Sequence, residues 1–160
     1  MSLDTHQVTW DASAQTYVAQ VWESASTYSF IKDGGIDTIR DHLDYMIDNY
    51  FNKTDTPTHR EWLKLGVLAV SGCATLDEAE TYTTLVGKQR DYGPNNIARF
   101  GNSGLLLRLH DKVARLENLV ANNREATNES IQDTYLDIVG YSVIGLMLMD
   151  GSFFSPMITA

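Results

Sequence analysis

Helical periodicity is the feature that most restricts the fold of this chain. Leu109, Val113, Leu116 and Val120 recur at steps of three or four residues, and this spacing places apolar side chains along one face of an α-helix. Beyond residue 25, no stretch alternates apolar and polar residues in a way that predicts a strand. A chain of 160 residues can bury one hydrophobic core, and we expect no second one. The sequence therefore predicts an all-α fold, a helical bundle around a single core.

Residues that start and stop helices mark the further elements. Besides a helix from Leu105 to Val120, we expect helices over Ile36 to Tyr50, from Thr56-Pro57 to Gly72, from a capping box at Thr75 and Glu78 to about Arg90, and from Glu129 to Met149. The stretch from Asp91 to Asn96 contains Gly93-Pro94 and is expected to be irregular, with a second short break from Gly101 to Gly104. Residues 7–22 fit either a short hairpin or a helix, and Gly151 to Ala160 a frayed tail or an oligomer contact.

Charge and cysteine content argue against several classes of protein. The formal net charge is −9, which argues against direct nucleic-acid binding, because that affinity comes mainly from Lys and Arg on phosphates. A small phosphate ligand is still compatible, since a few cations can hold it. Cys73 is the single cysteine and cannot form an intramolecular disulfide, so we expect a cytoplasmic location. No run of 18 apolar residues and no signal-like N-terminus is present, so no membrane partner is expected.

Three acids in the last predicted helix suggest a metal site. Glu129, Asp133 and Asp137 follow one another at steps of four residues. Like charges at this spacing destabilise a helix by roughly 0.2–0.5 kcal/mol per pair, and a bound cation offsets that cost. Carboxylate oxygens suit Mg²⁺. The alternative is structural: Ser130 and Asp133 form a capping box, and acids in the first turn favour the helix dipole.

The preceding helix carries cations that could bind phosphate. Arg108, Asp111, Lys112 and Arg115 are joined by steps of three and four residues, so they share one side of the helix. Two or three cations beside an acid can bind phosphate oxygens while the acid binds a metal. The alternative is a solvated charged face with an internal pair between Asp111 and Arg115.

The predicted irregular stretch supplies groups that could contact a base. Tyr92 offers an aromatic ring, and Asn95 and Asn96 offer amides that read the edge of a base. Asparagine is also an ordinary residue of turns and caps, so a purely structural role is the alternative.

Three blocks of the sequence resemble a known family. They are Lys88-x-x-Asp91-Tyr92-Gly93, then His110-Asp111-Lys112-x-x-Arg115-Leu116-x-Asn118-Leu119, then Asn128-Glu129-Ser130-x-x-Asp133-Thr134-x-x-Asp137-x-x-Gly140-Tyr141. This pattern, from about Lys88 to Met149, resembles the nucleotide modification associated domain 1 family, which is common in bacteriophages and related to the MazG-like all-α NTP pyrophosphohydrolases. The resemblance implies a MazG-like bundle over residues 75–150, an N-terminal extension of uncertain structure packed on it over 1–70, and a tail over 151–160.

The resemblance also implies roles for individual residues. MazG-like enzymes hold Mg²⁺ against a triphosphate with acids on two helices. By that analogy Asp111, Asp133 and Asp137 would converge on Mg²⁺ (or Mn²⁺), Glu129 would orient or deprotonate the attacking water, and Lys112 and Arg115 would neutralise charge on the phosphates. The substrate would be contacted by Lys88, Asp91, Tyr92, Asn95, Asn96 and Arg108. The chain departs from the pattern at Lys112 and Arg115, where further glutamates are expected.

The implied function is Mg²⁺-dependent hydrolysis of a (deoxy)nucleoside triphosphate, with an ordinary or a modified base, to monophosphate and pyrophosphate. Such a site is usually completed across a subunit interface, so a homo-oligomer is expected, in the host cytoplasm if the protein is phage-encoded. The alternative is a nucleotide-binding protein without turnover: a sponge, a sensor or an accessory subunit in nucleotide modification. Lys112 and Arg115, at positions where acids are expected, favour this alternative. A structural phage protein is a third, weaker possibility.

Overall fold

The computed structural model describes residues 8–27, 35–122 and 130–158, and this part of the chain is helical without strands. Its elements are α1 (Trp10–Thr27), α2 (Gly35–Phe51), α3 (His59–Gly72), α4 (Glu78–Tyr92), α5 (Asn95–Ala98), α6 (Gly101–Ala121), α7 (Ile131–Asp150) and the 3₁₀-helix η2 (Ser152–Phe154). The predicted all-α bundle is therefore confirmed. None of the described helices is long and apolar enough to span a membrane.

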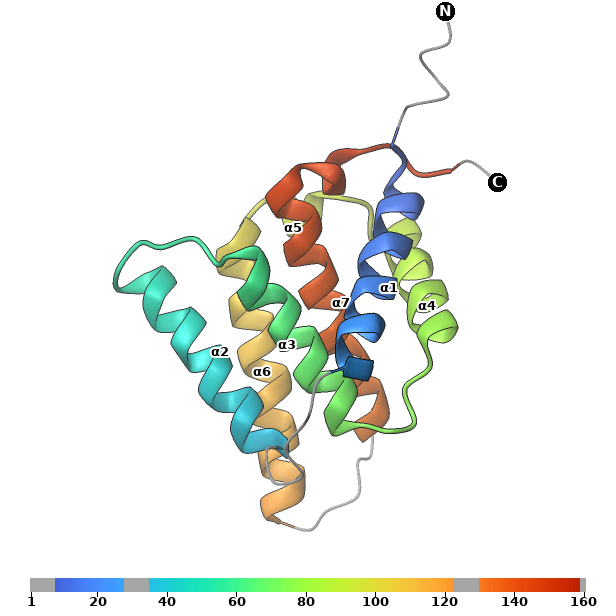
Figure 1. Cartoon of the computed structure of the whole chain (residues 1–160). Helices are drawn as coiled ribbons and strands as arrows, with labels where there is room; N and C mark the ends of the chain where they lie inside the picture. The colour runs from blue at the N-terminus through green and yellow to red at the C-terminus, as the bar shows by residue number, and fades with distance from the viewer. Residues whose placement is uncertain (1–7, 28–34, 123–129, 159–160) are drawn as a thin grey trace, which may run out of the picture.

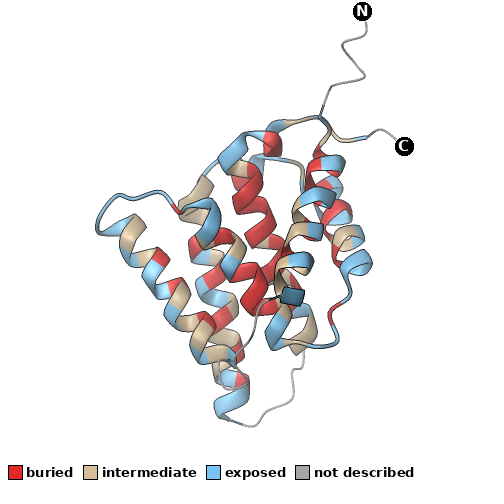
Figure 2. Ribbon diagram, in the orientation of Figure 1, coloured by how far each residue is buried: buried red, intermediate tan, exposed pale blue. Residues whose placement is uncertain are grey.

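Helix α7 is the centre of the bundle. It packs against α1, α3, α4 and α6, whereas α2 lies at the edge and contacts α3 and α6 (Figure 1). Most residues of α7 are buried, in contrast to the half-exposed α2 (Figure 2). The contact between α7 and α3 is the most extensive, because Gly145 lets the ring of Trp62 lie directly on the backbone: a Cβ added there would come within 2.3 Å of that ring. Burial on several sides is what the continuous apolar sequence of α7 requires, because apolar residues on all sides of a helix must be shielded from water.

The N-terminal third of the chain contributes to the same core. Residues 10–27 form a helix, so the helical alternative for residues 7–22 is correct from Trp10 onward and the hairpin is not formed. Trp10 on α1 and Trp62 on α3 are both fully buried. Helices α1 and α3 pack directly on α7. The division into a 1–70 extension packed on the bundle, a 75–150 domain and a 151–160 tail stays a prediction.

Helix starts differ in detail from the predicted ones. The cap of α3 is Thr58, which forms a capping box with Glu61, rather than Thr56-Pro57. The cap of α4 is Asp77, whose carboxylate accepts from the amide of Glu80, rather than the pair Thr75 and Glu78. Both predictions placed the cap two residues early, since several neighbouring side chains could cap the same turn.

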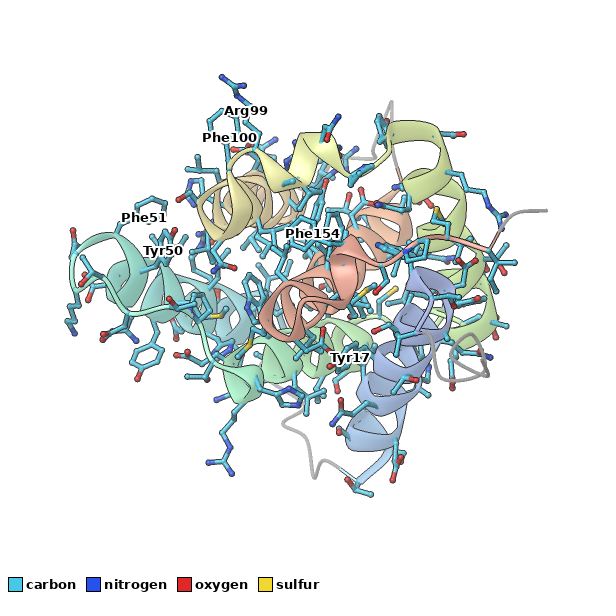
Figure 3. All side chains as sticks on the ribbon, turned by 90° about the horizontal axis from the view of Figure 1, so that it is seen from above. Tyr17, Tyr50, Phe51, Arg99, Phe100 and Phe154 are labelled. Atoms are coloured by element: carbon cyan, nitrogen blue, oxygen red, sulfur yellow. The ribbon has the colours of Figure 1, made fainter. Side chains whose placement is uncertain are left out.

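The stretch from Asp91 to Gly104 is more helical than predicted. Asp91 and Tyr92 belong to the last turn of α4, and Asn95 and Asn96 begin α5, so the irregular part is reduced to Gly93-Pro94 and Arg99-Phe100. The predicted break from Gly101 to Gly104 is wrong, because these residues form the first turn of α6. Gly101 has φ +53°, a conformation that glycine adopts without strain and that lets the chain enter the helix. Arg99 and Phe100 project outward at this corner (Figure 3).

The C-terminal segment packs on the bundle as far as it is described. Phe153 is buried and packs edge-on against Trp10. The amide of Trp10 donates to the carbonyl of Pro156, and the amide of Ile158 donates to the Asp11 carboxylate. The predicted frayed tail is therefore wrong for residues 151–158, and residues 159–160 lie outside the described part.

Candidate functional site

A pocket of about 500 Å³ opens between α4, α5, α6 and α7. Six residues predicted to bind substrate, phosphate or metal line it together: Lys88, Tyr92, Asn96, Arg108, Lys112 and Asp137. Its volume falls in the range of about 300–1,000 Å³ that is typical of small-molecule sites. The structure thus brings half of the predicted site into one cavity, with contributions from four helices.

An acid held between two lysines is the main polar feature of the pocket. The Nζ atom of Lys88, from α4, lies 2.6 Å from Oδ1 of Asp137. The Nζ atom of Lys112, from α6, lies 2.8 Å from Oδ2 of the same carboxylate. The side chain of Asp137 is only 11% exposed, whereas that of Lys88 is 50% exposed. Three helices therefore bring two ammonium groups to one largely buried carboxylate.

This arrangement keeps Asp137 ionised. Burial alone would raise the pKa of the carboxyl group, but the hydrogen bonds and charges of Lys112 and Lys88 outweigh burial and hold the pKa below its ordinary value. At neutral pH the described pocket walls contain one negative charge, on Asp137, and three positive charges, on Lys88, Lys112 and Arg108. The pocket is therefore locally cationic, in a chain whose formal net charge is −9.

The rest of the wall is amphipathic. Arg108 precedes Lys112 by one turn of α6, so the two cations lie on one side of that helix. Tyr92, 69% exposed, extends the wall into solvent. Leu85, Ile97, Leu136 and Ile144 supply apolar surface, and Gln89 and Asn96 supply amides. A wall of this composition can hold a ligand that is anionic at one end and flat and apolar at the other.

The predicted convergence of Asp111, Asp133 and Asp137 is not found. Asp111 and Asp133 are exposed and do not line the pocket. Within the described residues, no group of three or more His, Cys, Asp or Glu side chains could hold a metal. Asp133 belongs to the first turn of α7, at the end of the helix, and is exposed. Asp137 lies one turn further into the bundle, where lysines from α4 and α6 meet it.

The predicted catalytic residue Arg115 falls elsewhere. The guanidinium of Arg115 donates to Oγ1 of Thr134 at 2.7 Å, and Arg115 does not line the pocket. Glu129 lies outside the described residues. Half of the proposed capping box at the start of α7 is confirmed, because the Ser130 hydroxyl accepts from the amide of Asp133 and caps the helix.

Other site residues were misplaced or missed by sequence reasoning. Asp91 and Asn95, predicted to bind substrate, are exposed and do not line the pocket. The residues that were missed are Thr84, Leu85, Gln89, Ile97, Leu136, Gly140, Tyr141 and Ile144. Helical spacing would have found many of them, since Thr84 and Leu85 precede Lys88 by one turn and Gly140 and Tyr141 follow Asp137 by one turn.

A second pocket, of about 630 Å³, lies between the C-terminal end of α4 and the segment after α7. Phe153, Phe154, Pro156 and Met157 contribute much of its lining, with Arg90 as its charged group. It includes none of the predicted site residues. Arg90 lies 3.6 Å from the Asp11 carboxylate, so this charge is already paired.

One family model matches a segment of the chain that contains most of the first pocket. The model of the family described as nucleotide modification associated domain 1 matches residues 88–149. This confirms the resemblance predicted from the three sequence blocks. All residues that line the first pocket, apart from Thr84 and Leu85, lie within the matched segment. No curated protein and no solved structure matches the chain. The relationship to MazG-like enzymes stays a prediction.

Proposed function

We propose that the pocket between α4, α5, α6 and α7 binds a nucleotide, with the phosphate at the lysine pair. The observation that supports this most strongly is the meeting of Lys88 and Lys112 on the carboxylate of Asp137 inside a cavity of about 500 Å³. A partly buried group of cations is costly unless anions neutralise it, and the described wall contains one anion for three cations. A phosphate is an anion that such a wall favours.

The chemistry of the cations suits phosphate oxygens. The Lys88 ammonium has three donors and uses one on Asp137, so it can also donate to a phosphate without leaving the carboxylate. The guanidinium of Arg108 adds a planar set of donors that matches two phosphate oxygens at once. Hydrogen bonds between ionised partners are about twice as strong as neutral ones.

The remaining wall suits a base. The rings of Tyr92 and Tyr141 and the side chains of Ile97 and Leu136 offer surfaces against which a flat base can lie. The amide of Asn96 supplies both a donor and an acceptor for the edge of a base. The family description, with its association with nucleotide modification, agrees with a nucleotide ligand.

Binding without turnover fits the described residues better than Mg²⁺-dependent hydrolysis. Asp137 is the single acid among the described lining residues, and a lysine already donates to each of its oxygens. Mg²⁺ demands oxygen ligands in octahedral geometry, and this donor set does not fit it. Hydrolysis is the second candidate, because Asp137 places a carboxylate inside the pocket; an expected homo-oligomer could add further acids to it.

Equilibrium binding tests the proposal. We expect calorimetry of the full chain with a panel of ribo- and deoxyribonucleotides to detect binding, and Lys88→Gln to weaken it at least about tenfold, the effect of one charge-assisted contact. Lys88 is half exposed, so this change should leave the fold intact. Lys64→Gln is the matched control, since it removes the same charge from α3, which does not line the pocket.

The same samples distinguish binding from hydrolysis. Chromatography after incubation with Mg²⁺ should return every nucleotide unchanged. Release of monophosphate and pyrophosphate would favour the hydrolase instead. Absence of binding by any nucleotide, or equal losses in Lys88→Gln and Lys64→Gln, would contradict the proposed function.

A further inference from the structure

Gln89 is a buried amide on the wall of the first pocket. It belongs to α4, lines the pocket between α4, α5, α6 and α7, and is only 7% exposed. Among the residues that the structure describes, no group donates to its side chain or accepts from it. Burying an amide without a partner is unfavourable, and such groups are rare in folded proteins. A ligand in the pocket would supply the missing partner.

The other amide of the wall is already engaged. The Oδ1 atom of Asn96 accepts from the backbone amide of Ile97 at 2.9 Å, so this side chain is held at the start of α5 before any ligand arrives. Gln89 has no such local partner in the described part of the chain. Of the two amides, Gln89 is therefore the one whose hydrogen-bonding capacity is unused.

Apolar side chains share the buried part of the wall with Gln89. Three of them line the same pocket and are buried: Leu85, Ile97 and Leu136. The side chain of Lys88, by contrast, is 50% exposed. A nucleobase has two apolar faces and a polar edge, which matches buried apolar side chains together with one amide. A sugar, with hydroxyl groups on several sides, matches such a wall less well.

Gln89 also lines the second pocket, so the direction of its side chain matters. Its backbone carbonyl accepts from the amide of Gly93, a residue of that second pocket. Helical side chains lean toward the N-terminus of their helix and lie over the preceding turn. For Gln89 this turn contains Leu85, which lines the first pocket and not the second. The side-chain amide is therefore expected in the first pocket.

From these observations we infer that Gln89 reads the base of the nucleotide by hydrogen bonds to the edge of that base. The inference rests on the proposed function and names the part of the ligand that this residue recognises. An amide has a donor beside an acceptor, and rotation about its last bond presents them in either order. The ligand is accordingly a nucleotide whose base carries an acceptor beside a donor on the inserted edge. A base that lacks one of these groups leaves Gln89 unpaired, which is unfavourable.

Nucleotide pairs that differ at the base edge test the inference without a variant. Each common nucleoside monophosphate is compared with an analogue that lacks one donor: purine riboside for adenosine, 1-methylguanosine for guanosine, 3-methyluridine for uridine, and zebularine for cytidine. In calorimetry of the full chain, the best-bound natural nucleotide should bind at least about tenfold more tightly than its analogue, because the analogue leaves a buried amide unpaired. Affinities within about twofold would overturn the inference while leaving nucleotide binding intact.

The variant Gln89→Met removes the donor and the acceptor and keeps the length of the side chain. It should weaken binding of the best-bound nucleotide at least about tenfold and reduce its preference over the analogue to about twofold or less. Without nucleotide, it should raise Tm by about 2–4 °C, because an apolar side chain replaces a buried amide that lacks a partner. Gln15→Met is the matched control: it makes the same change at an exposed position of α1, whose described residues line neither pocket, and should alter neither affinity nor Tm.

The outcomes separate this inference from the proposed function. If Gln89→Met weakens binding but keeps the preference for the natural base, Gln89 contacts another part of the ligand and the inference is wrong. An unchanged or lower Tm in Gln89→Met would show that the amide already has a partner in the unliganded protein, which would also overturn it. Failure of every nucleotide to bind the wild-type chain would instead contradict the proposed function itself.

Discussion

Two ion-pair clusters join α6 to its neighbours, and their compositions are opposite. Toward α2, one cation lies between two acids: the guanidinium of Arg40 donates to Glu117 at 2.8 Å and to Asp44 at 3.1 Å, with the ring of His110 also 3.1 Å away. Toward α4 and α7, one acid, Asp137, lies between two cations. The side chains of Arg40 and Asp137 are buried to a similar degree, with 15% and 11% exposed.

The difference in composition suggests a difference in role. Arg40 directs Nε, Nη1 and Nη2 at protein groups, so this cluster fastens α2 to α6. The Asp137 cluster also fastens helices, but it lines a pocket and has more cations than acids among its described members. Ion pairs alone therefore do not identify a binding site. A local excess of one charge beside an open cavity is the more informative sign.

The Arg40 cluster should matter for stability and not for binding. We expect Arg40→Gln to lower the free energy of unfolding by about 1–2 kcal/mol, because Glu117 loses its main partner while remaining 39% exposed to water. Urea denaturation measures this. Lys53→Gln, which breaks an exposed pair with Asp48 at 3.5 Å, is the control and should change stability by less than about 0.5 kcal/mol.

Nucleotide affinity in Arg40→Gln should stay within about twofold of wild type, since neither Arg40 nor Glu117 lines the pocket. A large loss of affinity at unchanged stability would reverse the roles assigned to the two clusters.

Acid sensitivity provides a finer comparison. The pKa of Asp137 is lowered, because its two lysine partners outweigh the effect of burial. The pKa of Glu117 is also lowered, chiefly by its hydrogen bonds with Arg40. A carboxyl with a depressed folded pKa contributes stability that is fully present above its unfolded pKa, about 4, and is lost as pH falls through the folded value.

We therefore expect stability to fall as the pH drops below about 4, and both Asp137→Asn and Glu117→Gln to flatten that fall. The flattening should be larger for Asp137→Asn, because its carboxylate is 11% exposed and that of Glu117 is 39% exposed. Denaturation of the three proteins at a series of pH values measures the slopes. If the free energy of unfolding still falls more steeply with decreasing pH in Asp137→Asn than in Glu117→Gln, Asp137 is the less strongly paired of the two acids.

Sequence reasoning was most successful where apolar periodicity decides the structure. The helix over Ile36 to Tyr50 agrees with α2, and Leu109, Val113 and Leu116 of the predicted seam are buried along α6. Its fourth member, Val120, is wrong: it is 57% exposed near the end of the helix. It failed at Gly101, where glycine was taken as a break. A glycine with positive φ can instead introduce a helix.

The site was predicted in part, for a physical reason. The sequence showed which residues could bind a ligand, and six of the predicted ones line the pocket. It could not show that the partners of Asp137 would be Lys88, 49 positions earlier, and Lys112, because such contacts depend on how α4, α6 and α7 pack. Spacing along one helix suggested an acid row. Packing against α4 and α6 brings Asp137 to two lysines, whereas Asp133 is exposed to solvent.

The most direct test of the central claim is to map where a nucleotide binds in solution. Backbone amide NMR spectra of the full chain, recorded during titration with nucleoside monophosphates, should shift at Lys88, Tyr92, Asn96, Lys112 and Tyr141. The amide resonances of α2 around Arg40 should not shift, because the Arg40 cluster does not line the pocket. Shifts confined to α2, or to the second pocket at Phe153 to Ile158, would contradict the account even if a nucleotide binds.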